Sequence, residues 1–376
     1  MRELQEIRPE IDKVDRELVR LFEERMKLCC EVADYKIRTG KKVFDAAREQ
    51  EKLKALRAMA DTEFNEQCIG ELFSQMMCMS RKLQYQKLAQ NGKRAEHGFT
   101  GVEDIKKENI IVAYQGVEGA YSHQAMLQYF GKDVKNFHVK TFREAMEAIR
   151  DGKADYAVLP IENSSAGSVN DVYDLLLEFE NCIVAETFIK VEHALLGLPD
   201  AAIEDIRTVY SHPQALMQCS KFLERHKEWK SISELNTAVS ARKVVEAGDR
   251  SQAAIASELA AELCGLKVLQ RAVNDNKDNT TRFFIISREK LYTSHAKKVS
   301  ISFELPHESG TLYNMLSHVI FNHLNMTKIE SRPLEGSKWE YQFIIEVEGR
   351  LCDAEVENAL LGIREEAKSF KILGNY

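Results

Sequence analysis

The amino-acid sequence predicts a multidomain protein in which an all-α domain is followed by a two-lobed α/β domain and a small α+β domain. Its 376 residues, of which 44% are hydrophobic, exceed what one ordinary hydrophobic core organises. Apolar residues recur in steps of three and four over residues 1–89, and short apolar runs alternate with helical patterns over residues 109–286. Residues 299–376 follow the ferredoxin-like order βαββαβ, and the polar stretch 90–108 is predicted to be a linker.

Charge and composition favour a protein that handles small molecules. The net charge is −7, and basic residues alternate with acidic ones along the chain, so no block suits a nucleic acid or a membrane surface. The N-terminal residues lack an apolar signal core and no apolar run is long enough to span a bilayer, so we expect a cytoplasmic protein. The 8 cysteines are scattered without a C-x-x-C pair, which predicts reduced thiols and no bound metal or cofactor.

The first region is expected to contain one long helix, ended by Gly40, and two shorter ones over residues 45–59 and 65–89. An apolar seam defines the first helix, and its members are Leu4, Ile7, Ile11, Val14, Leu18, Leu21, Leu28, Val32 and Tyr35. A helix of roughly 35 residues would be about 50 Å long at 1.5 Å per residue, more than the shorter helices can cover. The length therefore predicts a homodimer or a higher homo-oligomer.

Arg25 interrupts this seam, where an unpaired guanidinium would cost several kcal/mol to bury. It must meet an internal anion, for instance Glu49, lie at a wet edge, or bind a ligand. Further polar residues share faces of the three predicted helices: Lys36, Asp45, Arg48, Glu49, Ser80 and Gln84. A polar interior in a helical bundle is by default a ligand site. Arg8 lies roughly 25 Å from Arg25 along one helix, so it could reach the same small ligand only from a second chain.

These eight residues and their spacing resemble the all-helical class of chorismate mutases over residues 4–89. The resemblance implies intertwined dimers in which Arg25 and the partner chain's Arg8 hold the two carboxylates of chorismate. Lys36 and Gln84 would donate hydrogen bonds to the ether oxygen, where negative charge grows as the C–O bond breaks. Asp45 and Glu49 would orient the ring hydroxyl, and Arg48 and Ser80 would support them.

The α/β region contains two segments that look alike, residues 141–164 and 236–260. Each reads as a helix, a glycine turn, a short strand and a polar loop that opens another helix. This duplication predicts two lobes with a ligand in the cleft between them and a largely parallel sheet, although a generic αβ alternation would look similar.

Four polar clusters adjoin apolar runs in this region, at residues 116–123, 162–165, 211–214 and 279–282. Each alone could be an ordinary turn or helix cap. Because loops at the ends of parallel strands converge on a crevice, together they predict a substrate site. A glycine-rich turn at the start of a helix, as at residues 116–123, also suits an anion.

The segments GAYSHQAM, PIENSSAGSVNDVYDLL, YSHPQALMQC and TTRFF resemble prephenate dehydratase, and the similarity extends over residues 109–286. The resemblance implies lobes like those of periplasmic binding proteins and a dehydration that depends chiefly on Thr281, with Glu162 as an alternative proton source. The remaining expected substrate-binding residues are Ser122, Asn163, Ser164, Ser211, Gln214 and Arg282. Prephenate and its aminated analogue arogenate both remain open as the substrate. The combined activities would convert chorismate through prephenate to phenylpyruvate in phenylalanine biosynthesis.

The C-terminal region could be a packing module only. Two of its segments resemble the ACT regulatory domain, and the resemblance implies that phenylalanine binds there and inhibits the enzyme, through Gly310, Thr311 and Leu312 and through Glu330, Ser331 and Arg332. A ligand-sensing transcription regulator is the alternative from another class. It is disfavoured because the first 89 residues lack a short helix-turn-helix and place their arginines in a packed seam.

Overall fold

The computed structural model describes residues 2–92, 97–334 and 340–376. The chain divides into two compact units, one made of Met1–His97 with Lys297–Ile372 and the other of Gly98–Ala296 with Leu373–Tyr376. We call them the mutase-side unit and the two-lobed unit. Among the described residues, no helix combines the length and the apolar character that a membrane span requires.

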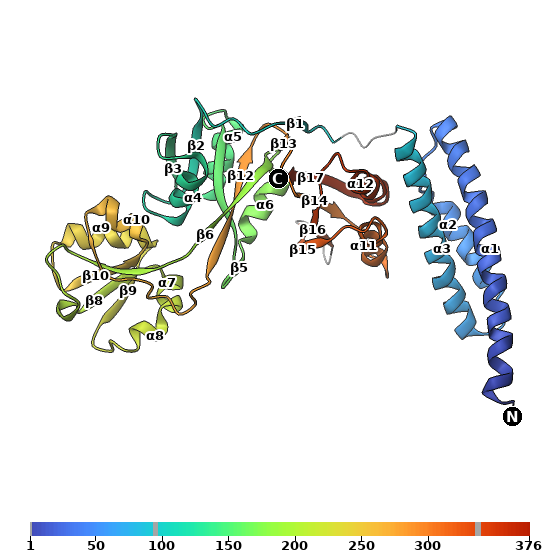
Figure 1. The fold of residues 1–376 in the computed structure, drawn as a ribbon, viewed down its shortest axis with the longest axis horizontal. Coiled ribbons are helices and arrows are strands. Elements are labelled where there is room, and N and C mark those ends of the chain that lie inside the picture. Colours follow the sequence, from blue (N-terminus) through green and yellow to red (C-terminus); the bar gives the residue numbers. More distant parts are fainter. Residues whose placement is uncertain (1, 93–96, 335–339) are drawn as a thin grey trace. The chain divides into compact units, whose positions relative to one another are not determined.

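The N-terminal residues form the expected helices α1 (Leu4–Thr39), α2 (Ala46–Arg57) and α3 (Glu63–Gln90) (Figure 1). α1 ends at Gly40, whose φ of 71° is the left-handed conformation that glycine adopts without strain. Asp45 precedes α2 and accepts a hydrogen bond from the backbone N–H of Arg48. The expectation that Asp45 lies within the second helix is therefore wrong, because its carboxylate caps that helix.

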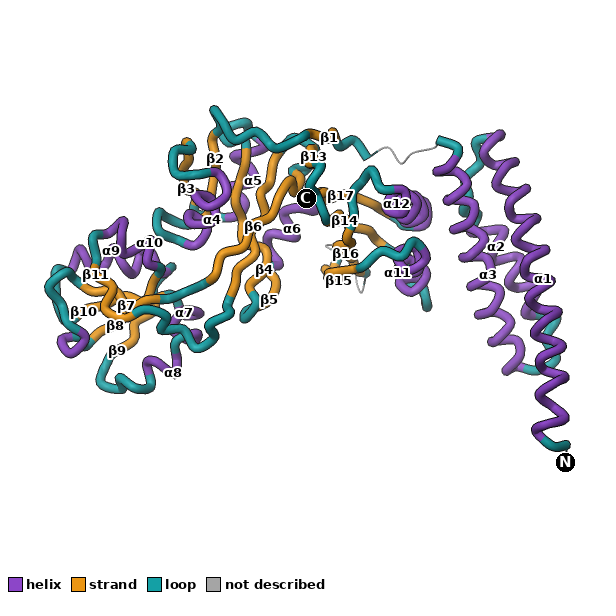
Figure 2. The backbone as a smooth tube through the Cα atoms, viewed as in Figure 1, coloured by secondary structure: helices purple, strands orange, loops and turns teal. Residues whose placement is uncertain are grey.

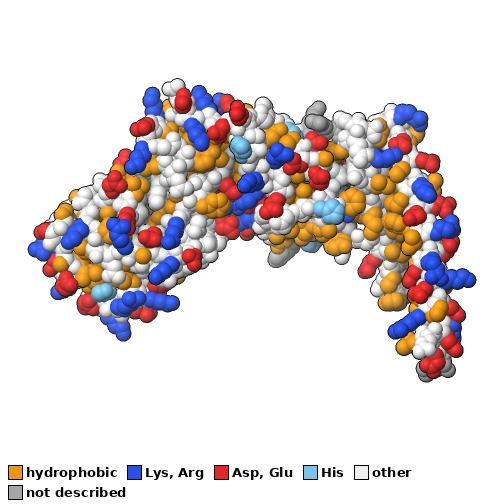
Figure 3. Space-filling view, in the orientation of Figure 1, with side chains coloured by type: hydrophobic (Ala, Val, Ile, Leu, Met, Phe, Trp, Pro, Cys, Tyr) orange, Lys and Arg blue, Asp and Glu red, His pale blue; other side chains and the backbone are white. Residues whose placement is uncertain are grey.

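The apolar seam of α1 is largely uncovered in one copy of the chain. Exposed fractions range from 44% at Val32 to 65% at Leu4, and Val14, Leu18 and Leu28 lie between these values. Figure 3 shows hydrophobic side chains at the surface of the helical region. An exposed apolar stripe of this length is typical of a face that packs against another chain.

The C-terminal part of the mutase-side unit has the expected βαββαβ order. Its elements are β14 (Lys298–Glu304), α11 (Thr311–Phe321), β15 (Met326–Pro333), β16 (Tyr341–Glu348), α12 (Ala354–Glu366) and β17 (Ser369–Asn375), and the strand order is β15-β16-β14-β17. Both α11 and α12 pack on the second half of α3. This packing buries Ser80, Arg81, Gln84 and Tyr85, so α3 is covered on more sides than its single apolar stripe predicts.

Each lobe of the two-lobed unit is built around a sheet of its own, and Figure 2 shows the strands of both lobes. In the first lobe the strand order is β6-β12-β4-β2-β3, formed by β2 (Ile111–Gln115), β3 (Lys135–Val139), β4 (Tyr156–Asn163), β6 (Cys182–Lys190) and β12 (Thr280–Ser287). Its helices are α4 (Tyr121–Phe130), α5 (Phe142–Arg150) and α6 (Asn170–Glu178), and the short β5 (Gly167–Ser168) pairs with β4.

The second lobe has the strand order β11-β7-β10-β8-β9. These strands are β7 (Ala194–Gly197), β8 (Thr208–Ser211), β9 (Lys230–Ser233), β10 (Gln252–Ala256) and β11 (Lys267–Gln270). The helices are α7 (Pro213–Gln218), α8 (Ser220–Leu223), α9 (Thr237–Ala247) and α10 (Glu258–Cys264), with a 3₁₀ turn at Ile203–Asp205. Each lobe has its own hydrophobic core, so the predicted two-lobed architecture is confirmed.

Two expectations about this unit need correction. Each sheet is mixed rather than largely parallel: β12 runs antiparallel to β4 and β6, and β7 runs antiparallel to β10 and β11. The chain leaves the first lobe after β6 and returns to it in β12, so these two strands run in opposite directions. The stretch expected to be a linker contains β1 (Thr100–Val102), which pairs with β13 (Leu291–Thr293), and it buries Phe99 and Ile105. A three-residue strand is too short to show a sequence period.

The last residues of β17 belong to the two-lobed unit. Gly374 pairs with Ile183 of β6 so closely that a Cβ on Gly374 would collide with the Ile183 carbonyl. The ring of Tyr376 packs 5.2 Å from that of Phe284, and Asn375 is fully buried. The last residues of the described chain therefore pack against β6 and β12.

Candidate active sites

A cavity of about 620 Å³ lies between the lobes of the two-lobed unit. Its polar wall comes from loops and helix starts of both lobes: Gln115, Tyr121, Ser122, Asn163, Ser168, Asn170, Asp171, His193, His212, Gln214, Gln218, Asn236, Thr237 and Thr281. The structure thus brings together four of the residues predicted from sequence, Ser122, Asn163, Gln214 and Thr281. None of the described residues that line this cavity is a lysine or an arginine.

Thr281 and Asn163 form a directed hydrogen-bond pair on the cavity wall. The Oδ1 of Asn163 accepts from the backbone N–H groups of Ser165 and Ala166, each at 3.0 Å, which fixes the orientation of the amide. Its Nδ2 then donates to the Oγ1 of Thr281 at 2.9 Å. Because Thr281 accepts this bond, its own hydroxyl proton is available to donate to a ligand in the cavity.

A tight turn beside this pair brings the start of α4 to the cavity. Gly119 has φ of 88°, and a Cβ there would approach the Cα of Ala260 in α10 to 3.1 Å. The hydroxyl of Ser257 donates to the Gly119 carbonyl at 2.9 Å, so the turn is fixed to the second lobe. The turn presents Tyr121 and Ser122 to the cavity, and Ser122 is one of the residues expected to bind substrate.

Glu162 and Arg282 do not line the cavity. Side chains alternate along strands, and where Thr281 and Asn163 face the cavity, their neighbours Arg282 and Glu162 face the opposite side of the sheet. There Arg282 pairs with Glu186, with Nη2 and Oε2 2.6 Å apart, and approaches Glu162 at 3.9 Å. The expectation that either residue contacts the substrate is not met by this geometry, because both strands continue through the polar cluster and turn these two side chains away from the cavity.

Ser164 and Ser211 also lie outside the cavity lining. The Oγ of Ser164 accepts from the backbone N–H of Thr280 at 3.0 Å, which joins the two loops that carry Asn163 and Thr281. Ser211 is fully buried and donates to the carbonyl of Ile255 at 2.6 Å, which links β8 to β10. Both hydroxyls therefore hold neighbouring backbone segments together and do not line the cavity.

His193 also lines the cavity, although no pattern in the sequence singled it out. One ring nitrogen lies 3.0 Å from the hydroxyl of Tyr121 and the other 3.1 Å from Oε1 of Gln218. Burial lowers the pKa of His193, and the hydrogen bond to Gln218 offsets part of this effect, so the neutral ring is favoured. A polar residue directly before the apolar strand β7 is the signal that could have identified it.

In the helical region, Arg25 meets α3 instead of Glu49. Its Nη1 donates to the Oγ of Ser80 at 2.6 Å and to the carbonyl of Met76 at 3.2 Å. Gln84 lies one turn further along α3, where its Nε2 donates to the carbonyl of Ser80 and its buried Oε1 has no hydrogen-bond partner among the described residues. The interior ion pair between Arg25 and Glu49 is therefore not formed.

Lys36 is half-buried and donates to the carbonyl of Val43 at 2.7 Å. Burial lowers the pKa of Lys36, whereas the charges of Asp45, Glu49, Glu365 and Cys29 act to raise it. Glu49 is paired with Arg81 of α3, a residue that the sequence analysis did not select. Arg48 is exposed on α2, and Arg8 is exposed near the start of α1, away from Arg25 in the same chain.

The residues expected to be regulatory lie at the start of α11 and near the end of β15 in the C-terminal region. Gly310 caps α11 with φ of 81°, and Thr311 donates from Oγ1 to the carbonyls of Pro306 and Glu308. Leu312 follows in the first turn of α11. Glu330, Ser331 and Arg332 lie near the end of β15.

Comparisons with known proteins agree with this arrangement. Residues 7–85 match the family model of chorismate mutase type II, and residues 112–291 match that of prephenate dehydratase. The bifunctional chorismate mutase/prephenate dehydratase of Escherichia coli K12 is 34% identical over 98% of this chain and 95% of its own length. The protein of the same description from Aquifex aeolicus is 33% identical over 100% of this chain and 98% of its own.

Solved structures match the part of the chain beyond the helices. A prephenate dehydratase from Arthrobacter aurescens, determined in complex with L-Phe, has a TM-score of 0.66 at 30% identity and covers 71% of this chain and 89% of its own. A structure described as GqqA, a quorum-quenching acylase, has a TM-score of 0.66 at 37% identity and covers 71% of this chain and 97% of its own. Matches to both domain models and to relatives over nearly the full length lead to one conclusion: the chain belongs to the bifunctional chorismate mutase/prephenate dehydratase family.

Proposed function

We propose that the polar interior of the helical region and the cavity between the lobes carry out consecutive reactions, chorismate to prephenate and prephenate to phenylpyruvate. The observation that carries the second assignment is the Thr281 hydroxyl, oriented by Asn163 into the cavity. The observation that carries the first is the convergence of Arg25, Ser80 and Gln84 on one stretch of α3, beside a half-buried Lys36.

The first reaction is a pericyclic rearrangement, in which one C–O bond breaks as a C–C bond forms. Arg25 would hold a carboxylate of chorismate, exchanging its bond to the Met76 carbonyl for the ligand. Lys36 and the amide of Gln84 would donate to the ether oxygen as negative charge develops there, and Glu49 would orient the ring hydroxyl. Donors placed in advance for developing charge contribute on the order of 3 kcal/mol each.

Arg8 takes part in this scheme from the partner subunit. In one chain Arg8 is exposed and the apolar seam of α1 is uncovered, from Leu4 through Val32. Packing two copies of α1 in opposite directions would cover the seam and bring the second copy's Arg8 toward Arg25. The proposed site is therefore complete only in a dimer.

In the second reaction, the bond from the ring to the hydroxyl and the bond to the carboxylate both break. The electron pair of the released CO2 enters the ring, which becomes aromatic as the hydroxyl departs. Thr281 would donate a hydrogen bond to the departing oxygen, since its Oγ1 already accepts from Asn163. Ser122 and Gln214 would position the substrate on the cavity wall.

The C-terminal region is proposed to be an ACT domain that binds phenylalanine and inhibits the dehydratase. Its βαββαβ order supports this assignment, as does the description of the Arthrobacter aurescens dehydratase as a complex with L-Phe. Measuring the dehydratase rate with and without millimolar phenylalanine tests the proposal. An unchanged rate would refute inhibition.

Substrate preference is the most informative test of the whole assignment. We expect the purified protein to consume chorismate and to convert prephenate to phenylpyruvate faster than it converts arogenate to phenylalanine. Chromatographic separation of the two products measures both rates in parallel. Faster turnover of arogenate would reassign the substrate, and absence of chorismate consumption would refute the mutase assignment.

A further inference from the structure

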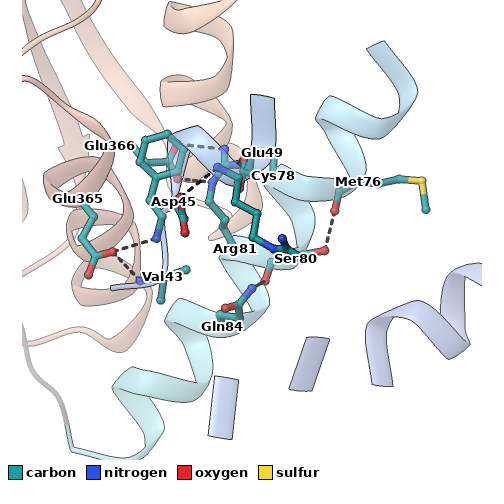
Figure 4. A network of polar contacts seen from close by, with 12 residues as sticks. Val43, Asp45, Glu49, Met76, Cys78, Ser80, Arg81, Gln84, Glu365 and Glu366 are labelled. Atoms are coloured by element: carbon teal, nitrogen blue, oxygen red, sulfur yellow. Dashed lines mark hydrogen bonds and ion pairs between the residues drawn. The ribbon is translucent and has the colours of Figure 1, made fainter. Parts of the chain in front are cut away.

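A buried charged network connects α2 and α3 with the C-terminal region of the mutase-side unit (Figure 4). Its centre is Arg81, whose side chain is 6% exposed and bonds Glu366 of α12 through Nε at 2.7 Å and through Nη2 at 3.2 Å. The remaining nitrogen of the guanidinium, Nη1, donates to Glu49 of α2 at 2.5 Å. The same carboxylate of Glu366 lies 3.0 Å from Nε2 of His318 in α11.

The buried groups of this network stabilise one another in their charged forms. Burial alone would lower the pKa of Arg81, but Glu366 and Glu49 raise it well above its ordinary value, so the guanidinium stays charged. Burial alone would raise the pKa of Glu366, and His318 and Arg81 lower it, so the carboxylate stays ionised. Gly362 of α12 leaves the space for the His318 ring, with which any Cβ at that position would collide.

Glu365, the neighbouring residue of α12, holds the loop between α1 and α2. Its Oε2 accepts from the backbone N–H groups of Val43 and Phe44, at 3.1 Å and 3.4 Å, and from the hydroxyl of Tyr85 at 3.2 Å. The carbonyl of the same Val43 accepts the bond from Lys36. The end of α12 therefore holds the segment to which the Lys36 ammonium is anchored.

A cavity of about 270 Å³ lies between the start of α11 and the charged groups of this network. Glu49, Arg81 and Phe44 line it from the helices, and Glu308, Thr311 and Glu366 line it from the C-terminal region. The segment that contains the proposed regulatory motif thus shares a wall with Glu49. A displacement of this segment would reach Glu49 through one layer of side chains.

We propose that the C-terminal end of α12 forms part of the mutase site, with Glu365 and Glu366 as positioning residues for Lys36 and Glu49. The carboxylate of Glu366 fixes Glu49 through Arg81, and Glu365 fixes Lys36 through Val43. Mutase turnover in this chain then depends on where α12 lies. This inference rests on the proposed mutase site, because Lys36 and Glu49 are its substrate-contacting groups.

The test uses the full-length protein and the initial rate of chorismate consumption as a function of pH. The titratable groups that act on Lys36 are the carboxylates of Asp45, Glu49 and Glu365 and the thiol of Cys29. Glu365→Gln keeps the shape and removes one of the charges that hold the proton on Lys36. We expect the alkaline limb of the mutase profile to move to lower pH by about one unit. Arg81→Met should lower mutase kcat/KM about tenfold, because Glu49 loses its anchor.

Lys87→Met is the matched control, since it removes an ion pair with Asp34 that also joins α1 to α3 but lies at the surface. It should leave both the pH profile and kcat/KM unchanged. The dehydratase rate of each preparation and the far-UV circular dichroism report folding, and if Arg81→Met disrupts the helices, Glu365→Gln decides alone. An unchanged alkaline limb in Glu365→Gln would overturn the proposal. Retained activity in Lys36→Ala would instead refute the mutase site itself.

Discussion

The two proposed sites bind similar dianionic ligands with different side chains, mainly charged in one site and mainly neutral and polar in the other. The helical interior gathers the charges of Arg25, Lys36 and Glu49 from α1 and α2. The cavity between the lobes is lined mainly by amides, hydroxyls and neutral histidines, with Asp171 but no lysine or arginine among its described residues. The charged neighbours of that cavity, Glu162 and Arg282, are turned to the far side of the sheet. A helix can aim long charged side chains inward from several positions, while a strand exposes only alternate residues.

The difference implies that the helical site works by charge and the cavity by orientation. In the helical site, positive groups attract the negative charge that develops on the ether oxygen. This attraction is strong when water is excluded. In the cavity, the substrate already gains aromaticity as it reacts, and the wall mainly has to direct a hydrogen bond at the departing hydroxyl. The following experiments test this contrast.

Removing the ammonium from the helical site should have the largest effect. Lys36→Ala is expected to lower mutase kcat/KM about 10³-fold, because a charged donor to the ether oxygen is lost. The dehydratase rate of the same protein should stay within experimental error, and it serves as the internal folding control. A mutase loss below tenfold would show that charge at this position is not what drives the rearrangement.

Removing the hydroxyl from the cavity should have a smaller but still large effect. Thr281→Ala is expected to lower dehydratase kcat about 10²-fold, and Thr281→Ser should keep most of the rate because it keeps the donor. Glu162→Gln is the paired variant, expected to change the rate less than about threefold because its side chain lies outside the cavity. Equal losses in Glu162→Gln and Thr281→Ala would mean that a carboxyl proton reaches the substrate.

Loosening the orientation of that hydroxyl should cost about tenfold. Asn163→Ala removes the donor to Thr281 and leaves the N–H groups of Ser165 and Ala166 without their acceptor. The expected loss corresponds to the one hydrogen bond that orients Thr281. The loss should appear in kcat more than in KM if Asn163 acts through Thr281. Combining Asn163→Ala with Thr281→Ala should then add little further loss, which a double-mutant cycle measures.

The smallest effect concerns the pH dependence of stability. The pKa of His193 is lowered by burial, so the unfolded state takes up its proton first as the pH falls below the ordinary histidine value near 6.5. The stability that the neutral ring contributes is present above that pH and is lost as the pH falls toward the folded-state pKa, with a slope of less than one proton. In His193→Gln, denaturant titrations should show a shallower loss across this window. An unchanged slope would assign the acid sensitivity to other groups.

The element order and the ends of many elements could be predicted from the sequence because local signals determine them. Gly40 marks the end of α1, and the polar cluster before Phe283 locates Thr281, which does reach the cavity wall. The direction of Glu162 and Arg282 could not be predicted in this way. Both strands extend through the polar cluster, and a bulge at Ile161 of β4, opposite Arg282 and Phe283, shifts the alternation along β4. Strand ends and bulges depend on pairing partners that one segment does not reveal.

The role of Arg81 was missed for a different reason. On α3 it reads as one more basic residue between Ser80 and Gln84, and its partner Glu366 lies 285 positions later in the chain. No periodic pattern links residues so far apart. The signal that was available is that α3 carries polar residues on nearly every face of its second half, which a helix with one buried stripe does not need.

In the proposed dimer, the uncovered stripe of α1 makes the stability of the helical region, but not that of the lobes, depend on protein concentration. A part that completes its core with a second copy loses stability on dilution, whereas both lobes close their cores within one chain. As the solution becomes more dilute, the melting temperature of the helices should fall while that of the lobes stays constant. Phenylpyruvate formation should then persist at concentrations where chorismate is no longer consumed.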